Sequence, residues 1–172
     1  MTDHKFESIR LLAPDVSRET FLRLIQFEDL FRRWNATINL ASPSTIPELW
    51  TRHILDSAQI AALRPLSGKW LDLGSGGGLP GAILAILAGQ ERKAHINLVE
   101  SNGKKAAFLQ TVISQSQSPA SVHVMRIEKA ADKIGPADVV TARALAPLKE
   151  LIGLAFPWLS KGATGLFHKG RD

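Results

Sequence analysis

The chain has 172 residues, about the size of one α/β domain, and 45% of them are hydrophobic, so it can bury a core of its own. Cysteine is absent, which excludes disulfides and thiolate-held metal sites, and the five histidines lack the spacing of metal ligands. Lys and Arg outnumber Asp and Glu by 21 to 16, and the resulting net charge of +5 favours a polyanionic partner. The longest apolar run, residues 82–88, is far shorter than the roughly 20 residues of a membrane-spanning helix. We therefore expect a soluble protein without a membrane span, an export signal or a bound metal.

The N-terminal part of the chain shows helical periodicity. Apolar residues recur at three-to-four spacing over residues 19–34, which predicts an amphipathic helix with Ser17 as its N-cap. Polar amides in residues 34–40 interrupt this periodicity and predict an ordered loop. A second helix is expected to begin near Pro47, because proline suits the first helical turn. Residues 1–66 are therefore predicted to form an N-terminal helical extension.

In the rest of the chain, short apolar runs alternate with helical stretches. Strands are predicted over residues 70–73, 96–99, 122–127, 138–140 and 165–167. Such alternation implies right-handed crossovers and a mostly parallel sheet with helices on both faces. Residues 67–172 are therefore predicted to form a Rossmann-like α/β core. Because the chain ends soon after the fifth predicted strand, we expect this core to lack its C-terminal strands.

A glycine-rich loop follows the first predicted strand and runs from Gly74 to Gly81, with Pro80 near the first position of the next helical stretch. Glycines permit positive φ angles and carry no Cβ that would block a ligand lying against the backbone. The helix that follows presents free N–H groups to such a ligand. We therefore expect a ligand to lie close against this loop; a tight turn without a ligand is the alternative.

The register of the glycines bears on which ligand the loop binds. The pattern Gly76-x-Gly78-x-x-Gly81 formally satisfies the dinucleotide fingerprint, but Gly74 already closes the strand. The register that begins with Asp72 two positions before Gly74 fits better, because an acid there suits a ligand with a cationic amino acid and does not suit a pyrophosphate. This favours S-adenosylmethionine as the cofactor. An NAD-dependent dehydrogenase is the alternative, although the chain has no tyrosine and no convincing catalytic His–Asp pair.

Two strand ends are candidates for holding an adenosine. Glu100 ends the second predicted strand, where an acid can accept hydrogen bonds from both ribose hydroxyls; a solvated strand end is the alternative. Ile127 and Glu128 end the third predicted strand and are expected to flank the adenine ring. Glu128 could instead begin the next helix as a favourable N-terminal charge.

Several blocks of residues in this order resemble the signature of the 16S ribosomal RNA guanine-N7 methyltransferase family, RsmG or GidB. The resemblance spans residues 27–170 and depends on the combination of blocks, because the glycine loop alone would be generic. The blocks are Trp34-Asn35 with Asn39-Leu40, Arg52-His53-Ile54-Leu55-Asp56-Ser57, Asp72 to Gly81, Arg143-Ala144 and Lys169-Gly170.

The resemblance implies a cytoplasmic bacterial enzyme with a Rossmann-like S-adenosylmethionine-dependent methyltransferase fold. It implies methyl transfer to N7 of a guanine in the decoding region of 16S ribosomal RNA, as free RNA or in the small ribosomal subunit. In the family, the residues that match Gly74, Leu79, Ile127, Glu128 and Arg143 belong to the cofactor pocket. From the residues themselves we add Asp72, Gly76, Gly78 and Glu100 to the cofactor-binding candidates.

The chemistry of guanine N7 limits what the site needs. N7 carries a free lone pair and no proton at neutral pH, so we expect no general base, and the task reduces to placing the reacting atoms in line. Arg143 is the first candidate for positioning the cofactor or target nucleotide, because arginine fits the Hoogsteen edge of guanine or a phosphate; a salt bridge to a nearby acid is the alternative. Arg52, His53 and Lys169 are candidates for RNA binding, although capping or packing is the alternative for Arg52 and His53.

The acceptor is less constrained by the residues than the cofactor is. A methyltransferase acting on another RNA position or on a small molecule, and a nonenzymatic RNA-binding protein with a vestigial pocket, are the alternatives. We expect the protein to act as a monomer.

Overall fold

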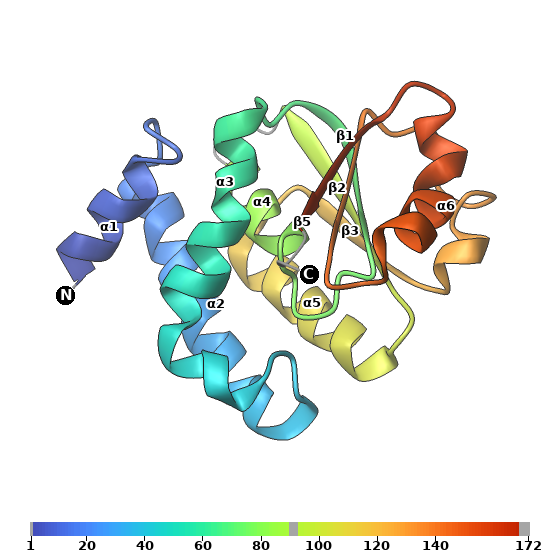
Figure 1. The fold of residues 1–172 in the computed structure, drawn as a ribbon. Coiled ribbons are helices and arrows are strands. Elements are labelled where there is room, and N and C mark those ends of the chain that lie inside the picture. The colour runs from blue at the N-terminus through green and yellow to red at the C-terminus, as the bar shows by residue number, and fades with distance from the viewer. Residues whose placement is uncertain (1, 90–92, 169–172) are drawn as a thin grey trace.

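The N-terminal part of the chain is helical, and helices and strands alternate after it (Figure 1). The computed structural model describes residues 2–89 and 93–168. Before the first strand lie α1 (Thr2–Arg10), α2 (Arg18–Ile38), the 3-10 helix η1 (Pro43–Glu48), the π-helix η2 (Trp50–Leu55) and α3 (Asp56–Leu63). After them come β1 (Gly68–Leu73), α4 (Gly81–Ala88), β2 (Ala94–Glu100), α5 (Gly103–Ser116), β3 (Ala120–Val124), the 3-10 helix η3 (Ile127–Lys129), β4 (Val139–Arg143), α6 (Leu148–Leu159) and β5 (Thr164–His168).

The five strands form one sheet in the order β3-β2-β1-β4-β5, and every pair is parallel. Leu73 at the end of β1 pairs with Val99 on one side and with Ala142 on the other. The chain therefore reverses its direction across the sheet between β1 and β4, and in open α/β sheets ligands bind outside the carboxyl ends of the strands at such a point. The expected Rossmann-like α/β fold is confirmed.

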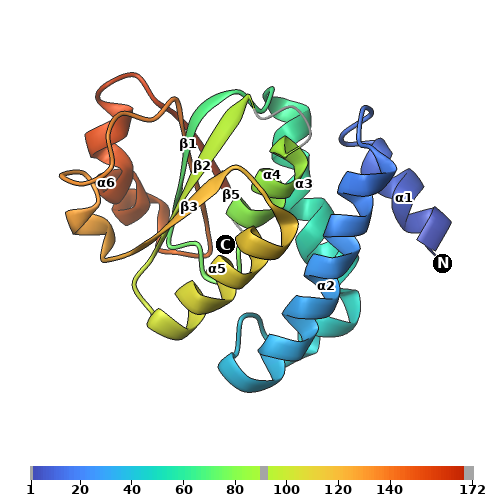
Figure 2. The same cartoon turned by 180° about the vertical axis from the view of Figure 1, so that it is seen from behind.

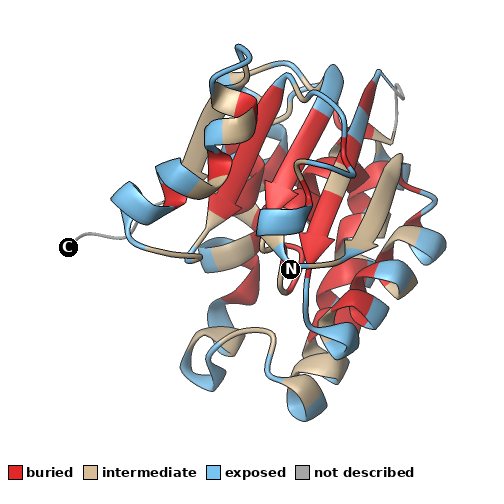
Figure 3. Ribbon diagram, turned by 90° about the vertical axis from the view of Figure 1, so that its right-hand side faces the viewer, coloured by how far each residue is buried: buried red, intermediate tan, exposed pale blue. Residues whose placement is uncertain are grey.

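Side chains of β1 alternate between two apolar layers. Trp70 faces the layer of α4 and α5, whereas Leu71 and Leu73 face the layer that contains α6. Helices therefore cover both faces of the sheet, with α5 beside α2 on one side and α6 on the other (Figure 2). The central strands are largely buried, and the edge strands β3 and β5 are half-buried (Figure 3).

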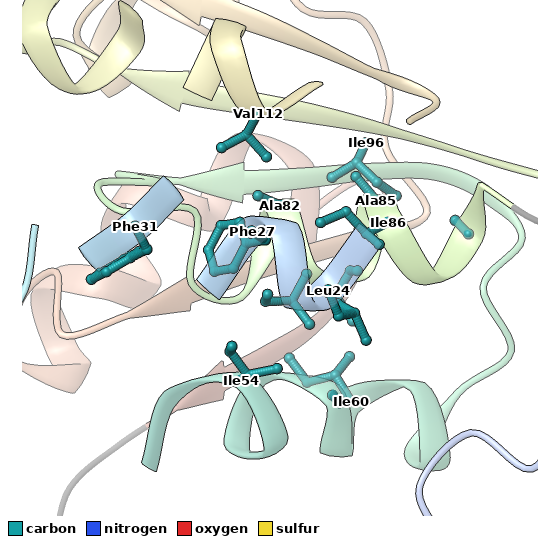
Figure 4. Packing of buried hydrophobic residues seen from close by; sticks show 14 of the residues in the cluster. Leu24, Phe27, Phe31, Ile54, Ile60, Ala82, Ala85, Ile86, Ile96 and Val112 are labelled. Carbon is teal, nitrogen blue, oxygen red and sulfur yellow. The ribbon is translucent and has the colours of Figure 1, made fainter. Parts of the chain in front are cut away.

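The N-terminal helices pack on the helices that cover the sheet. Phe27 and Phe31 of α2 lie within ring-contact distance of Phe108 on α5, at 6.2 and 5.8 Å between centroids. Ile54 and Leu24 belong to the same apolar cluster, which reaches Ile96 of β2 (Figure 4). Burial of this shared surface fixes the N-terminal helices against the sheet layer. None of the described helices is long and apolar enough to cross a membrane.

The loop expected over residues 34–40 is wrong, because α2 continues to Ile38. Asn35 does not interrupt the helix: its Oδ1 accepts hydrogen bonds from the Leu40 and Ala41 N–H groups at 2.7 and 2.8 Å. Asn39 then ends the helix in the left-handed conformation, with φ 51°, as asparagine commonly does at this position. Packing and capping by these amides outweigh their low helix propensity.

Other predicted boundaries also need correction. Pro47 lies inside the 3-10 helix η1 and does not begin an α-helix; η1 starts at Pro43. The third strand ends at Val124, and Ile127 belongs to the 3-10 helix η3. The strand ends there because its partner β2 ends at Glu100, so no further ladder is available.

Candidate active site

A cavity of about 700 Å³ opens at the carboxyl ends of the parallel strands. Its floor is the glycine loop, and its sides are the segment after α2, the ends of β2 and β4, and the turn before η3. This is the position that the sheet topology predicts for a ligand site. The described residues that line it are Leu40, Ala41, Ser42, Thr45, His53, Gly74, Ser75, Gly76, Gly77, Leu79, Val99, Glu100, Ser101, Lys105, Met125, Arg126, Ile127, Glu128, Arg143, Ala144, Leu145, Ala146, Glu150 and Leu154.

Glycine occupies positions of this loop for two different structural reasons. A Cβ at Gly74 would lie 2.6 Å from Leu145 Cδ1, and one at Gly78 would lie 2.5 Å from Ala82 Cβ, so these positions are closed by protein packing. A Cβ at Gly76 would meet one atom only among the described residues, the Gly74 carbonyl oxygen at 3.7 Å. Gly76, with φ 53°, therefore turns its open side to space that the protein does not fill.

Glu100 joins the glycine loop to the start of α5. Its Oε2 accepts the Gly76 N–H at 2.8 Å, and its Oε1 accepts the Asn102 N–H at 2.7 Å. The carboxylate is buried and lines the cavity. Each oxygen has a second lone pair, so Glu100 can still accept hydrogen bonds from a ribose while it holds the loop. Its assignment to the ribose stays a prediction.

Asp72 lies beneath the loop and not in the cavity. It is 1% exposed, and its Oδ1 accepts a hydrogen bond from Thr141 Oγ1 at 2.7 Å. Its Oδ2 is buried without a hydrogen-bond partner of good geometry, although the start of α4 at Gly81 faces it. Burial raises the pKa of Asp72 to about 6. An effect of this acid on a ligand therefore has to pass through the backbone above it, and its assignment to the cofactor stays a prediction.

Gly78, like Asp72, does not line the cavity, because it faces α4 and α5. Leu79, by contrast, lines the cavity directly, as do Ile127 and Glu128. The last two follow a bend after β3. The expectation that they end the strand itself is wrong. Their approach to an adenine ring stays a prediction.

Arg143 is the last residue of β4, whereas the strand predicted from the sequence ended at residue 140. Its Nη1 lies 3.3 Å from Asp56 Oδ2, and its Nη2 donates to the Arg52 carbonyl at 3.1 Å and to His53 Nδ1 at 2.9 Å. The salt bridge that was the alternative for Arg143 is present, yet the residue also lines the cavity. Arg143 therefore fixes η2 to the carboxyl end of β4.

The block from Arg52 to Asp56 contacts β5 as well as β4. His168 of β5 donates from Nε2 to the Asp56 carbonyl at 2.9 Å, so the block is tied to two neighbouring strands. Of the predicted RNA contacts, Arg52 is exposed, His53 is half-buried and faces the cavity, and Lys169 lies outside the described residues. Whether Arg52 and His53 contact RNA stays a prediction.

Two sides of the cavity carry residues that the sequence analysis did not predict as site residues, although Leu40 and Ala144 belong to the family blocks. Residues 40–45 form one side, and beyond Leu40 their sequence signal is their place after the asparagine that ends α2. Ala144 and Leu145 form another. Ala144 has φ 49°, a left-handed conformation that is rare for alanine, and it directs Leu145 back over Gly74. Nothing in the sequence signals that strained turn.

No group of three or more metal-ligating side chains occurs in residues 2–89 and 93–168. Two titratable side chains that line the cavity already hold hydrogen bonds: His53 Nδ1 accepts from Arg143, and both oxygens of Glu100 accept from backbone N–H groups. Glu128 and Glu150 line the cavity as well. That the site works without a general base stays a prediction.

A protein-family model for GidB, described as rRNA small subunit methyltransferase G, matches residues 21–172 of the chain. The chain belongs to this family. The ribosomal RNA small subunit methyltransferase G of Chelativorans sp. is 54% identical over 172 residues, which are 100% of this chain and 82% of the relative. The protein of the same name from Brucella anthropi is 56% identical over 170 residues, which are 99% of this chain and 80% of the relative. The GidB family expected from the sequence is confirmed.

Solved structures resemble this GidB chain at low sequence identity. A mutant of MtNAS in complex with S-adenosylmethionine aligns with a TM-score of 0.56 at 17% identity, over 85% of this chain and 58% of that chain. The precorrin 8w decarboxylase of Methanobacterium thermoautotrophicum aligns with a TM-score of 0.53 at 14% identity, over 65% of this chain and 60% of that chain. At these identities the likeness shows the fold alone.

Proposed function

We propose that this GidB protein transfers a methyl group from S-adenosylmethionine to N7 of a guanine in small-subunit ribosomal RNA. Membership of the family supports the activity class, the cofactor and the ribosomal RNA substrate. The observation that carries the proposal in the structure is Gly76, whose open side faces the cavity at the carboxyl ends of the strands. We further propose that residues 1–66 are a helical extension of a core formed by residues 67–172, and that the protein acts as a monomer in the cytoplasm.

The cavity fits the proposed cofactor in size and in donor set. A volume of about 700 Å³ exceeds what one nucleoside-sized ligand needs, so a second planar group has room beside it. Glu100 supplies carboxylate oxygens at one end, and the hydrophobic side chains of Leu79 and Ile127 supply apolar surface. Gly76 leaves room for the ligand against the backbone. These residues would hold the cofactor.

The chain's own residues are suited to orientation and not to proton transfer. S-adenosylmethionine supplies a methyl group that is activated by its sulfonium. Since guanine N7 carries no proton, the protein has only to bind both partners, align them and exclude water. His53 cannot take up a proton at Nδ1 without losing the Arg143 hydrogen bond, so it is not poised as a base. Arg143 presents a guanidinium fixed by His53, Arg52 and Asp56 at the cavity, which suits the O6 of guanine or a phosphate and leaves the N7 lone pair free for the methyl group.

Basic side chains continue from the cavity to the surface. Lys105 and Arg126 line its adenosine side, and the exposed Arg52 lies beside Arg143. Together with the net charge of +5, they favour binding of a phosphate backbone around the mouth of the cavity. We therefore propose that the RNA enters over η2 and reaches the cavity past Arg143.

The product identifies the reaction. Small-subunit particles are incubated with the protein and tritiated S-adenosylmethionine, and the labelled nucleoside is separated by chromatography after nuclease digestion. We expect the label on N7-methylguanosine. Label on cytosine C5 or on a ribose oxygen would reject the proposed acceptor. RNA binding without cofactor binding, measured by calorimetry, would instead indicate a nonenzymatic RNA-binding protein.

A further inference from the structure

A continuous hydrogen-bond chain links the carboxyl end of β4 to the side of the cavity formed by residues 40–45, which we call the 40–45 wall. Arg143 Nη2 donates to His53 Nδ1 at 2.9 Å. The other ring nitrogen, Nε2, lies 2.8 Å from Thr45 Oγ1. The Thr45 hydroxyl in turn donates to the Ser42 carbonyl at 2.8 Å. The chain thus connects β4 through side chains to η2 and to the 40–45 wall, although Arg143 and His53 are 90 residues apart in the sequence.

The direction of this chain follows from the donors and acceptors. A guanidinium has no acceptor, so His53 Nδ1 accepts and the proton of the neutral ring lies on Nε2. That N–H then donates to Thr45 Oγ1, whose own hydrogen is committed to the Ser42 carbonyl. Every atom therefore has one role. A proton on Nδ1 would place two N–H donors face to face and would break the contact with Arg143.

The charges around His53 favour this arrangement. Arg143 on β4 and Arg52 on η2 face the ring, and Asp56 pairs with Arg143 at 3.3 Å. Burial and the two arginines lower the pKa of His53 below its ordinary value of 6.5, while Asp56 acts in the opposite sense. The ring is therefore neutral at physiological pH, as the hydrogen-bond chain requires.

The 40–45 wall is held at both ends by side chains. At its start, Asn35 Oδ1 accepts the N–H groups of Leu40 and Ala41, and Leu40 packs against the glycine loop, where a Cβ at Gly77 would lie 3.3 Å from its Cβ. At its end, Thr45 is fixed by His53. The first tie links the wall to α2, and the second links it to the strand end at which Arg143 faces the cavity.

We propose that Thr45 and His53 are positioning residues for methyl transfer, which hold the 40–45 wall against the acceptor side of the cavity through Arg143. This inference rests on the proposed function. Neither side chain takes up a proton or reacts. Because the same guanidinium contacts His53 and lines the cavity, the position of the wall and the position of Arg143 are coupled.

The first test compares threonine variants in steady-state methylation of small-subunit particles. Thr45→Val keeps the shape but removes the hydroxyl, and we expect kcat/KM for the particles to fall about tenfold, the effect of one hydrogen bond. Thr45→Ser keeps the hydroxyl and restores the rate. Thr111→Val is the matched control, because Thr111 lies on α5 away from η2, and its hydroxyl donates to the Ala107 carbonyl outside the cavity. Unchanged transfer by Thr45→Val, or equal losses in Thr45→Val and Thr111→Val, would overturn the inference.

The second test does not depend on activity. Nitrogen NMR of the histidine rings in the wild-type protein should show His53 protonated on Nε2 and bare on Nδ1, with an Nε2–H that exchanges slowly with water. Thr45→Val should accelerate that exchange, and Thr45→Ser should not. A proton on Nδ1, or an Nε2–H signal that is indifferent to Thr45→Val, contradicts the inference. If the wild-type protein methylates no RNA, the proposed function fails. The NMR spectrum of the histidine rings still decides whether the hydrogen-bond chain from Arg143 to Ser42 exists.

Discussion

The glycine loop and the 40–45 wall form the floor and one side of the same cavity, but different interactions shape them. The loop is shaped by packing of its backbone: Gly74 and Gly78 are closed by neighbouring side chains, and Gly76 is left open. The wall is shaped by hydrogen bonds from side chains elsewhere, at Asn35 on α2 and at His53 on η2. Changes in the loop should therefore alter folding or cofactor binding, whereas changes around the wall should alter transfer.

The largest expected effects separate two glycines of the loop. Gly78→Val places a branched side chain where a Cβ already lies 2.5 Å from Ala82 Cβ, at φ 79°, and we expect it to lower the free energy of unfolding by about 3 kcal/mol or more. Gly76→Val meets open space, so the protein should fold with a smaller loss of stability but lose cofactor affinity by about a hundredfold or more. Chemical denaturation and equilibrium dialysis measure the two effects. Tight cofactor binding by Gly76→Val would show that the ligand does not lie against this loop.

These two glycines also show what could and could not be predicted from the sequence. The glycine loop, the parallel sheet and the family could be predicted because each has a local signal: a period, a turn residue or a run of motif residues. The sequence could not distinguish Gly76 from Gly78, since their difference depends on α4 and α5 packing behind the loop. It also could not find the partners of Arg143, because Asp56 and His53 come from a segment far away in the chain.

The next effect concerns Asp72, the buried acid beneath the loop. Burial raises its pKa from the ordinary value of 3.8 to about 6, so its contribution to stability is complete below the ordinary pKa and is lost as the pH rises through 6. Asp72→Asn removes the charge. Relative to wild type, its free energy of unfolding should therefore rise by about 2 kcal/mol from about pH 4 to about pH 8. Urea denaturation at several pH values measures this, and a constant difference between the two proteins would place the ionisation elsewhere.

Glu100 should show a loss of similar or smaller size in cofactor binding. Glu100→Ala removes the acceptor of the Gly76 N–H and the proposed ribose acceptor, and we expect cofactor affinity to fall roughly ten- to a hundredfold. Glu100→Gln keeps the shape and one acceptor, so it should lose less. Calorimetric titration gives both values. Affinity equal to wild type in Glu100→Ala would mean that the ribose is bound by other residues.

The smallest expected effect lies at Ala144, which turns Leu145 over the loop. Glycine relieves the left-handed conformation at φ 49°, so Ala144→Gly should raise the free energy of unfolding by up to about 1 kcal/mol. Ala144→Val, which is β-branched, should lower it by about 1 to 2 kcal/mol. Thermal denaturation of the two variants gives the order. The opposite order would mean that the turn is not strained.

The central claim is methyl transfer by positioning, without a general base. The most direct measurement is the single-turnover rate of transfer to small-subunit particles at saturating cofactor, as a function of pH. Because N7 is unprotonated and His53 stays neutral above its lowered pKa, the rate should be nearly flat from about pH 7 to about pH 8.5, and Arg143→Ala should lower it strongly at every pH in that range. A rate that rises with unit slope across the range, or transfer that is insensitive to Arg143→Ala, would contradict the account.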